Sequence, residues 1–237
     1  MKTLLIALAL AAPLAQAADV ATMLKNADAF RGSGQQQIDT LIEVSNPDGS
    51  PDKERRYTVL TAPERRSLVL MTSPAEKGQK VLMLGDDFWL LMPGSQRPMR
   101  ITPTQRLLGD ASTGDIATQS WSEDYEGALI GEERCEALAC WHLQLKAKRR
   151  GVTYQRIELW LGKTRHEPLH AELYVQSEKL AKKARFIMDK TQVTEMVLQD
   201  ALSNRKLTHV RYQSRKPRQV PQSWFNPMFL ARSPVLE

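Results

Sequence analysis

The sequence predicts a mainly β protein whose strands follow one another as an antiparallel meander. Two observations predict this class. Polar and apolar residues alternate with a period of two along most of the chain, and short turns such as Gly85-Asp86 separate the alternating segments. Helical patterns are few, and a run of about a dozen short strands in hairpin order curls into a barrel or partial barrel. We therefore expect one curled, β-rich domain.

The first 17 residues have the pattern of a secretory signal peptide. Lys2 precedes an apolar run from Leu4 to Ala12, and the small residues of Ala15-Gln16-Ala17 offer a cleavage site. The apolar run of about ten residues is too short for a membrane span, which takes about 20. We expect cleavage after Ala17, a single domain over residues 18–237 and a periplasmic location.

The charge balance is modest and the charges are mixed along the chain. Lys and Arg number 33 and Asp and Glu 27, which gives a formal charge of +6. Only short segments such as 146–150 and 179–185 concentrate basic residues. Solvated strand faces explain this distribution, so we expect no nucleic-acid partner. We also expect a monomer.

The chain has two cysteines, Cys135 and Cys140, with four residues between them. An even number of closely spaced cysteines in an exported chain indicates a disulfide, here across the arms of a hairpin. A zinc half-site is the alternative, but no second Cys or His pair lies nearby to complete four ligands. We expect a disulfide and no metal.

The elements are expected in the following order. Apolar residues at helical spacing over 19–30 predict a first helix that ends at Gly32. Alternation from Gln37 to Val44, a turn over 46–50 and a strand around Tyr57 and Val59 predict the first hairpin. Further strands are expected at 65–72, 79–84, 87–92, 140–148, 152–161, 170–176, 184–190, 193–199 and 206–213.

Two proline-rich segments interrupt the meander. The first, 93–126, is expected to hold a short helix near Thr104 to Leu108 and a polar loop, and the second is the tail from Pro217. The strands over 79–84 and 87–92 are apolar on both faces, which is typical of a strand covered on each side. One cover is ordinary core, and the other is either core or a ligand cavity.

No motif in the chain predicts catalysis or a cofactor. His166 to His170 reads as H-E-x-x-H, but Pro168 lies inside it and the flanking residues alternate as strands, whereas the motif needs a helix. On a strand the two histidines would be roughly 13 Å apart, too far to share a zinc ion. Ser112 lacks the G-x-S-x-G context of a nucleophile. The carboxylate pairs Asp86-Asp87 and Glu132-Glu133 are expected at solvated turns. We therefore expect a binding protein and not an enzyme.

Residues 78–116 resemble the outer-membrane lipoprotein-sorting family related to the periplasmic carrier LolA. The similarity is carried by Gly85-Asp86, Phe88-Trp89, Pro93, Arg97-Pro98, Arg100-Ile101, Pro103, Gln105-Arg106 and Gly109-Asp110, and also by Ala27-Asp28, Arg31-Gly32 and Phe225-Asn226-Pro227. The resemblance implies a half-open antiparallel barrel with a short helical lid over an apolar cavity. It also implies a carrier of lipid or lipoprotein acyl chains between the envelope membranes, working with an inner-membrane exporter.

An acyl-binding cavity is expected along strands 79–92 and 157–161. Acyl chains gain about 0.8 kcal/mol per buried CH2 and need no directed polar contact. The residues expected to line the cavity are Leu82, Leu84, Trp89, Leu91, Ile157, Leu159 and Leu161. A phase error of one residue would select the opposite face of each strand. An envelope sensor or protein-interaction module with the same fold remains the alternative function.

Overall fold

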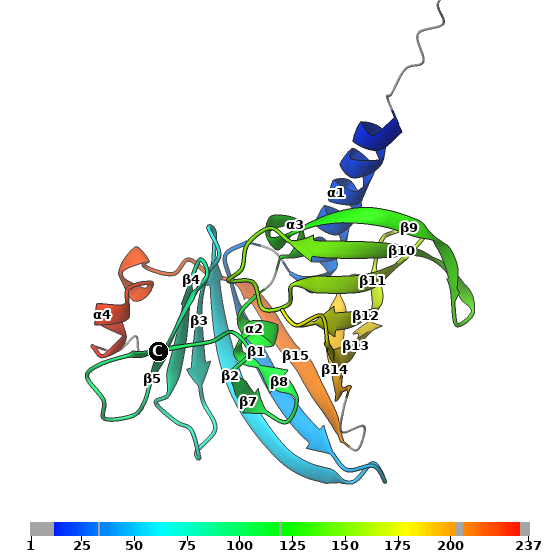
Figure 1. The fold of residues 1–237 in the computed structure, drawn as a ribbon. Coiled ribbons are helices and arrows are strands. Elements are labelled where there is room, and N and C mark those ends of the chain that lie inside the picture. The colour runs from blue at the N-terminus through cyan, green and yellow to red at the C-terminus, as the bar shows by residue number, and fades with distance from the viewer. Residues whose placement is uncertain (1–11, 33, 119, 202–205, 233–237) are drawn as a thin grey trace, which may run out of the picture.

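The computed structural model describes residues 12–32, 34–118, 120–201 and 206–232. The chain forms one antiparallel sheet of 13 strands, a two-stranded ribbon and several helices (Figure 1). The elements are α1 (Ala12–Arg31), β1 (Gln36–Ser45), β2 (Pro51–Ala62), β3 (Arg66–Met71), β4 (Lys80–Leu84), β5 (Asp87–Leu91), β6 (Met99–Ile101), β7 (Arg106–Leu108), β8 (Ala111–Ser112), α2 (Thr113–Ala117), α3 (Trp121–Asp124), β9 (Tyr125–Cys135), β10 (Leu138–Ala147), β11 (Arg156–Gly162), β12 (Pro168–Tyr174), β13 (Leu180–Met188), β14 (Val193–Asp200), β15 (Leu207–Pro217), η1 (Gln222–Trp224) and α4 (Pro227–Leu230).

The large sheet is a meander that is joined in its middle. Strands β1 to β6 and strands β9 to β15 pair in chain order, and β15 pairs with β1 to unite the two halves. Gln36 therefore faces Thr61 of β2 on one side and Pro217 of β15 on the other. Over the described residues the edge strands β6 and β9 do not pair with each other, so the curled sheet stays open (Figure 1). The predicted mainly β, half-open barrel is confirmed.

Helix α1 covers the concave face of the sheet. The predicted spacing over 19–30 is confirmed: Val20, Met23, Leu24 and Ala27 are buried and belong to the main core. The helix ends where predicted, at Gly32, whose φ of 93° suits glycine. Burying side chains of this kind contributes about 1.5–3 kcal/mol each. The core residues of α1 thus hold the helix against the sheet.

The expected signal peptide remains a prediction. Residues 1–11 lie outside the described residues, and the expected cleavage site after Ala17 falls within α1. Within the part of the chain that the structure describes, every helix is too short or too polar to cross a membrane.

A second apolar cluster lies on the opposite, convex face of the sheet. Leu68, Leu70 and Leu82 form its centre, and Phe225 and Leu230 from the C-terminal segment cover it. Both faces of β3 to β5 are thus buried: α2 and the main core lie on one side, and the C-terminal segment with α4 lies on the other (Figure 1). This double cover explains why these strands are apolar throughout.

Several expectations about individual helices and strands were wrong. The short helix expected near Thr104 to Leu108 is strand β7, and the short helices α2 and α3 follow it instead. Strand β9 was not predicted, because its glycines and Glu132-Glu133 resemble a turn; those two carboxylates lie on this strand. Strand β13 begins at Leu180, four residues before the predicted start at 184.

The predicted disulfide is present at the end of the β9–β10 hairpin. Cys135 and Cys140 are bonded, and their Cα atoms are 5.9 Å apart. Cys135 is the last residue of β9 and faces Leu138 of β10, so the bond links the two arms beside the turn. It fixes the free end of a long hairpin at the open edge of the sheet.

Reduction of this disulfide should lower the free energy of unfolding by about 2 kcal/mol, the chain-entropy value for so small a loop. Urea unfolding with and without dithiothreitol measures the difference. In the double variant Cys135→Ala/Cys140→Ala the reductant should change nothing. An equal effect of the reductant on both proteins would contradict a stabilising bond.

Candidate ligand-binding site

A cavity of about 370 Å³ opens at the end of the barrel where α1 stops. We call it the mouth cavity. Its walls come from the last turns of α1, the β2–β3 turn and the segment 117–124, and they include Lys25, Pro63, Met83 and Ser122. Its size is within the range of about 300–1,000 Å³ that is usual for small-ligand sites. It is therefore large enough to admit part of a ligand.

A much smaller apolar pocket lies inside the barrel. It has a volume of about 40 Å³, and Trp121, Ile157, Phe186 and Met196 are among its lining residues. The Trp121 and Phe186 rings meet edge to face, with centroids 5.6 Å apart. The interior pocket shares Thr118 with the mouth cavity, so the two spaces adjoin. In this conformation the interior is closed to any ligand larger than about one water molecule.

A carboxylate of α1 holds the short helix α3 in place. Asp28 is buried and accepts hydrogen bonds from the backbone N–H groups of Trp121 at 2.7 Å and Ser122 at 2.9 Å. It also accepts one from the hydroxyl of Ser120 at 2.9 Å. The guanidinium of Arg31 lies 3.9 Å from the centre of the Trp121 ring. We call these contacts the α1–α3 latch, and they separate the interior pocket from the mouth.

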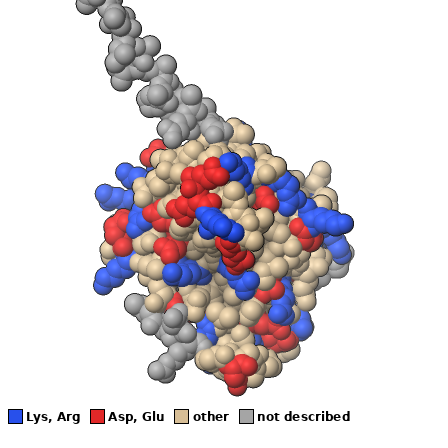
Figure 2. All heavy atoms as spheres, turned by 90° about the vertical axis from the view of Figure 1, so that its right-hand side faces the viewer, with Lys and Arg blue, Asp and Glu red and all other residues tan. Residues whose placement is uncertain are grey.

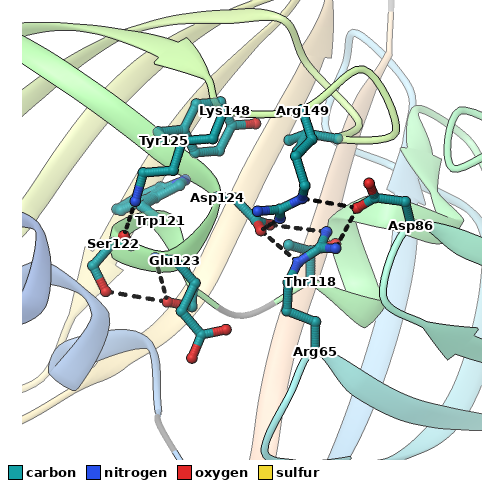
Figure 3. A network of polar contacts seen from close by, with 12 residues as sticks. Arg65, Asp86, Thr118, Trp121, Ser122, Glu123, Asp124, Tyr125, Lys148 and Arg149 are labelled. Atoms are coloured by element: carbon teal, nitrogen blue, oxygen red, sulfur yellow. Dashed lines mark hydrogen bonds and ion pairs between the residues drawn. The ribbon is translucent and has the colours of Figure 1, made fainter.

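A network of four charged side chains closes the open side of the sheet (Figure 3). Asp124, at the end of α3, is almost fully buried and pairs with Arg65 at 2.5 Å and with Arg149 at 2.5 Å. Asp86 pairs with the same two arginines: it lies 3.2 Å from Arg149 and also forms an ion pair with Arg65. Burial opposes the charge of Arg149, but Asp86 and Asp124 raise the pKa of its guanidinium above the ordinary value. We call this network the polar seam.

The seam joins segments that no strand pairing connects. Arg65 lies in the β2–β3 turn and Asp86 in the β4–β5 turn, whereas Arg149 lies in the β10–β11 loop. A Cβ atom on Gly151 would lie 2.3 Å from the Cβ of Asp86, so only glycine lets this loop approach so closely. Asp86 lies in a turn, as expected, but its partly exposed carboxylate is paired with Arg65 and Arg149 and is not solvated alone. Ion pairs take the place of hydrogen-bonded strands across the gap.

A second buried ion pair fixes α2 inside the barrel. Asp115 of α2 and Lys182 of β13 are both buried, with Oδ2 and Nζ 2.6 Å apart. Tyr154 and Ser112 each donate a hydrogen bond of 2.7 Å to the same carboxylate. Burial alone would raise the pKa of Asp115, but Lys182 and these hydrogen bonds lower it below the ordinary value. The carboxylate is therefore ionised at neutral pH.

The structure separates the seven residues expected to line an acyl cavity. Leu82, Leu84, Trp89 and Leu91 belong to the convex cluster under the C-terminal segment. Ile157, Leu159 and Leu161 belong to the main core on the concave face. Of the seven, only Ile157 lines the interior pocket, and Leu91 lines a separate groove of about 570 Å³ beside Ala231. The seven residues therefore do not share one cavity.

The histidine motif does not form a chelating helix. His166 lies in the turn before β12 with a φ of 60°, and Pro168 begins the strand. His170 stacks on Trp160 with ring centroids 4.4 Å apart. Among the described residues, no group of three or more His, Cys, Asp or Glu side chains is arranged to hold a metal ion. Ser112, the serine weighed as a nucleophile, is buried beside Asp115 and Lys182.

Acidic and basic side chains are intermixed on the face that lies to the right in Figure 1, as Figure 2 shows. Opposite charges pair across the strands of this region, as in Lys163 with Glu132 at 2.6 Å and Lys183 with Glu172 at 3.0 Å. Pairs of this kind are exposed and contribute little to stability. The face thus carries no broad field of one sign.

The sequence analysis missed the acids that organise the site. Asp115 lies in the short helix α2 and Asp124 ends the short helix α3, where an acid is hard to distinguish from a turn residue, whereas Asp28 lies within the long helix α1. Asp28 does carry a signal, because it lies on the apolar side of α1, between Leu24 and Arg31. An acid on the apolar side of a helix indicates a buried polar partner.

Loss of the Asp28 carboxylate should release α3. In Asp28→Ala, the backbone N–H groups of Trp121 and Ser122 lose their acceptor, so their protection from hydrogen exchange should fall at least about tenfold and stability by about 1–2 kcal/mol. Asp48→Ala is a matched control, since Asp48 accepts from the Ser50 N–H at 2.9 Å in an exposed turn. Unchanged exchange at 121–122 in the Asp28 variant would argue against the latch.

Neutralising Asp115 should destabilise the protein by about 3–5 kcal/mol, because Lys182 would remain as an unpaired buried charge. Adding Lys182→Met to Asp115→Asn should recover part of this loss. Because the pKa of folded Asp115 lies below its unfolded value, its contribution is present at neutral pH and is lost as the pH falls through the folded value. Between pH 7 and pH 3, the free energy of unfolding measured with urea should therefore fall less steeply in Asp115→Asn than in the wild type. If the free energy of unfolding of Asp115→Asn fell with pH as steeply as that of the wild type, ionised Asp115 would not be the stabilising group.

Comparisons with known proteins agree with this geometry. A family model described as "-like: Uncharacterized protein" matches residues 63–232. A search of curated proteins finds no match. A DUF1329 family protein from Desulfovibrio piger has 19% identity and a TM-score of 0.70, covering 89% of this chain and 97% of its own. An outer membrane lipoprotein-sorting protein domain from Vibrio parahaemolyticus has 18% identity and a TM-score of 0.69, covering 90% and 98%. These two structures share the fold.

A LolA superfamily protein from Nitrosomonas europaea is more similar in sequence. It has 32% identity and a TM-score of 0.78, and the match covers 86% of this chain and 96% of that protein. Identity at this level over nearly the whole of both chains extends the likeness from the fold to the sequence. The chain belongs to the LolA superfamily.

Proposed function

We propose that this chain is a periplasmic carrier that holds an acyl chain of a lipid or lipoprotein inside its open barrel. The observation that carries the proposal is the apolar concave face of the sheet, which α1 covers and which the mouth cavity adjoins. The Vibrio parahaemolyticus relative of the same fold is named for outer membrane lipoprotein sorting. An inner-membrane exporter that delivers the acyl chain is the partner that this role requires.

The closed interior indicates how loading works. The interior pocket of about 40 Å³ is far below the volume that an acyl chain needs, so uptake must displace part of the core. The latch and the seam are the contacts that hold α3 over this interior. An entering chain gains about 0.8 kcal/mol for each buried CH2, so a few methylene groups offset the loss of these polar contacts. Loading therefore exchanges protein contacts for contacts with the acyl chain.

Two further observations support the proposal: the disulfide fits an oxidising compartment, and the polar groups of the site fit binding better than catalysis. The Cys135–Cys140 disulfide is characteristic of exported proteins, in agreement with the expected signal peptide. The Ser112 hydroxyl is buried between Asp115 and Lys182, where no substrate can reach it in this conformation. The polar groups of the site hold helices in place and leave the interior apolar.

Filling the interior pocket should block acyl binding. Ala184 is buried and lines that pocket, so Ala184→Leu would occupy the space of about 40 Å³. We expect the affinity for fluorophore-labelled palmitate to fall at least about tenfold, with folding retained at a cost of about 1–3 kcal/mol. Fluorescence titration measures binding, and circular dichroism with urea unfolding measures folding.

Ala231→Leu is the matched control, because it makes the same enlargement in the convex groove of about 570 Å³. This variant should bind the probe as the wild type does. Loss of binding in Ala231→Leu alone would move the acyl site to the convex groove. Wild-type protein that never binds the probe, even after delipidation, would contradict the carrier and favour a protein-interaction module.

A further inference from the structure

Arg215 places a guanidinium group inside the barrel, beneath the end of α1. It lies on β15 opposite Ile38, a residue of the main core, so both side chains are on the concave face. A Cβ atom on Gly32 would lie 3.3 Å from Nε of Arg215 and 2.8 Å from Nε2 of Gln36. The donor groups of Arg215 and Gln36 therefore converge on one point under Gly32.

Most of these donors have no acceptor. Nη1 of Arg215 donates to the side chain of Gln192 at 3.0 Å, but its Nε and Nη2 are buried without a hydrogen-bond partner. Nε2 of Gln36 is also buried and unpaired, and Gln36 is only 8% exposed. An unpaired buried donor costs about 1–3 kcal/mol, and more when it is charged. Three such atoms at one point are unusual in a native structure.

The local charge is positive. Among the described residues, no carboxylate forms an ion pair with Arg215, whose guanidinium lies over the Tyr212 ring at 4.4 Å. Burial lowers the pKa of Arg215, and the nearby charge of Arg31 lowers it further, although Tyr212 and Asp189 act in the opposite direction. Arg31 itself is compensated, since it lies 3.9 Å from Asp28 and donates a hydrogen bond of 3.4 Å to the backbone carbonyl of Thr118.

The end of α1 does not account for this arrangement. A helix C-terminus carries about half a negative charge, which is too little to neutralise the guanidinium of Arg215. A capping role would also require the donors to bond the last carbonyl groups of the helix, and Nε and Nη2 of Arg215 bond no acceptor. Glycine at position 32 keeps the space in front of these donors open.

We infer that Arg215 and Gln36, with Arg31 beside them, bind the anionic headgroup of the carried lipid through its carboxylate or phosphate oxygens. The planar fork of arginine matches two such oxygens, and the Gln36 amide supplies a further donor. Arg31 also lines the interior pocket, so an acyl chain held there would have its headgroup near α1. The inference rests on the proposed function and specifies it: the ligand is an acidic amphiphile.

The test compares two probes that differ only in the headgroup. Hexadecanoate and hexadecan-1-ol, each with the same fluorophore at the tail, are titrated into the full-length protein and into Arg215→Gln. We expect the wild type to bind the acid about tenfold to hundredfold more tightly than the alcohol, and the variant to lose this preference. Lys216→Gln is the matched control, since it removes one positive charge from an exposed position on the same strand and should retain the preference.

Stability without ligand separates binding from a structural role. If Arg215 is kept for a ligand, Arg215→Gln should unfold at the same or a higher urea concentration than the wild type, because it removes an uncompensated buried charge. Lower stability of this variant would indicate a structural role and overturn the inference. Arg215→Lys keeps the charge but loses the fork, so a partial preference for the acid is expected if the site recognises oxygens in pairs.

Three other outcomes are informative. Equal binding of acid and alcohol by the wild type would overturn the headgroup site and leave the carrier proposal standing. Binding of neither probe would contradict the carrier itself. Inorganic phosphate that competes with the acid and also binds without any acyl chain would show a site for a free anion, which would overturn the assignment to a lipid.

Discussion

In a closed barrel every strand has two hydrogen-bonded neighbours, but in this protein β6 and β9 have one each within the large sheet. The missing pairing must be replaced if the concave face is to be shielded from water. The replacement is the polar seam, in which Asp124 and Asp86 pair with Arg65 and Arg149. Ion pairs are easier to rearrange than a hydrogen-bonded ladder, because each contact breaks separately and water solvates its partners. The placement of α3 and of the site depends on this substitution.

The edge strands themselves fit an open sheet. Strand β6 spans only Met99–Ile101, and β9 presents Glu132 and Glu133 at its exposed end. Short and charged edges discourage pairing with a second chain. The disulfide at Cys135 limits fraying of the β9–β10 hairpin at the same edge. These features oppose association of two chains through the open edge of the sheet.

Much of the fold could be predicted from the sequence, because its information is local. Alternation with a period of two located most strands, and the Gly32 stop located the end of α1. The phase of the β4 and β5 side chains could not be predicted, since both faces are buried and only the fold decides which face meets the main core. For this reason Leu82 and Leu159 were expected in one cavity although they lie on opposite faces.

The candidate site was less accessible to sequence reasoning than the fold. Asp124 and Arg149 are 25 residues apart and Arg65 and Asp124 are 59 apart, so no local spacing reveals the network that they form. The sequence pattern did not single out Arg215, and its half-buried place on the concave face follows from the pairing of β15 with β1. Charged residues at the ends of strands are visible in a sequence, but the closure of the sheet decides which of them face inward.

The buried charges of the barrel differ in how well they are compensated. Lys182 and Asp115 neutralise each other, and Tyr154 and Ser112 occupy the remaining acceptor sites, so this group forms a complete structural unit. Arg215 has one of its donors satisfied and two buried without acceptors. Folding alone does not favour such an arrangement, because an apolar residue in the same place would avoid the desolvation cost. A ligand with anionic oxygens would supply the missing partners, and a chain that carries such a ligand gains affinity from the same feature that costs it stability.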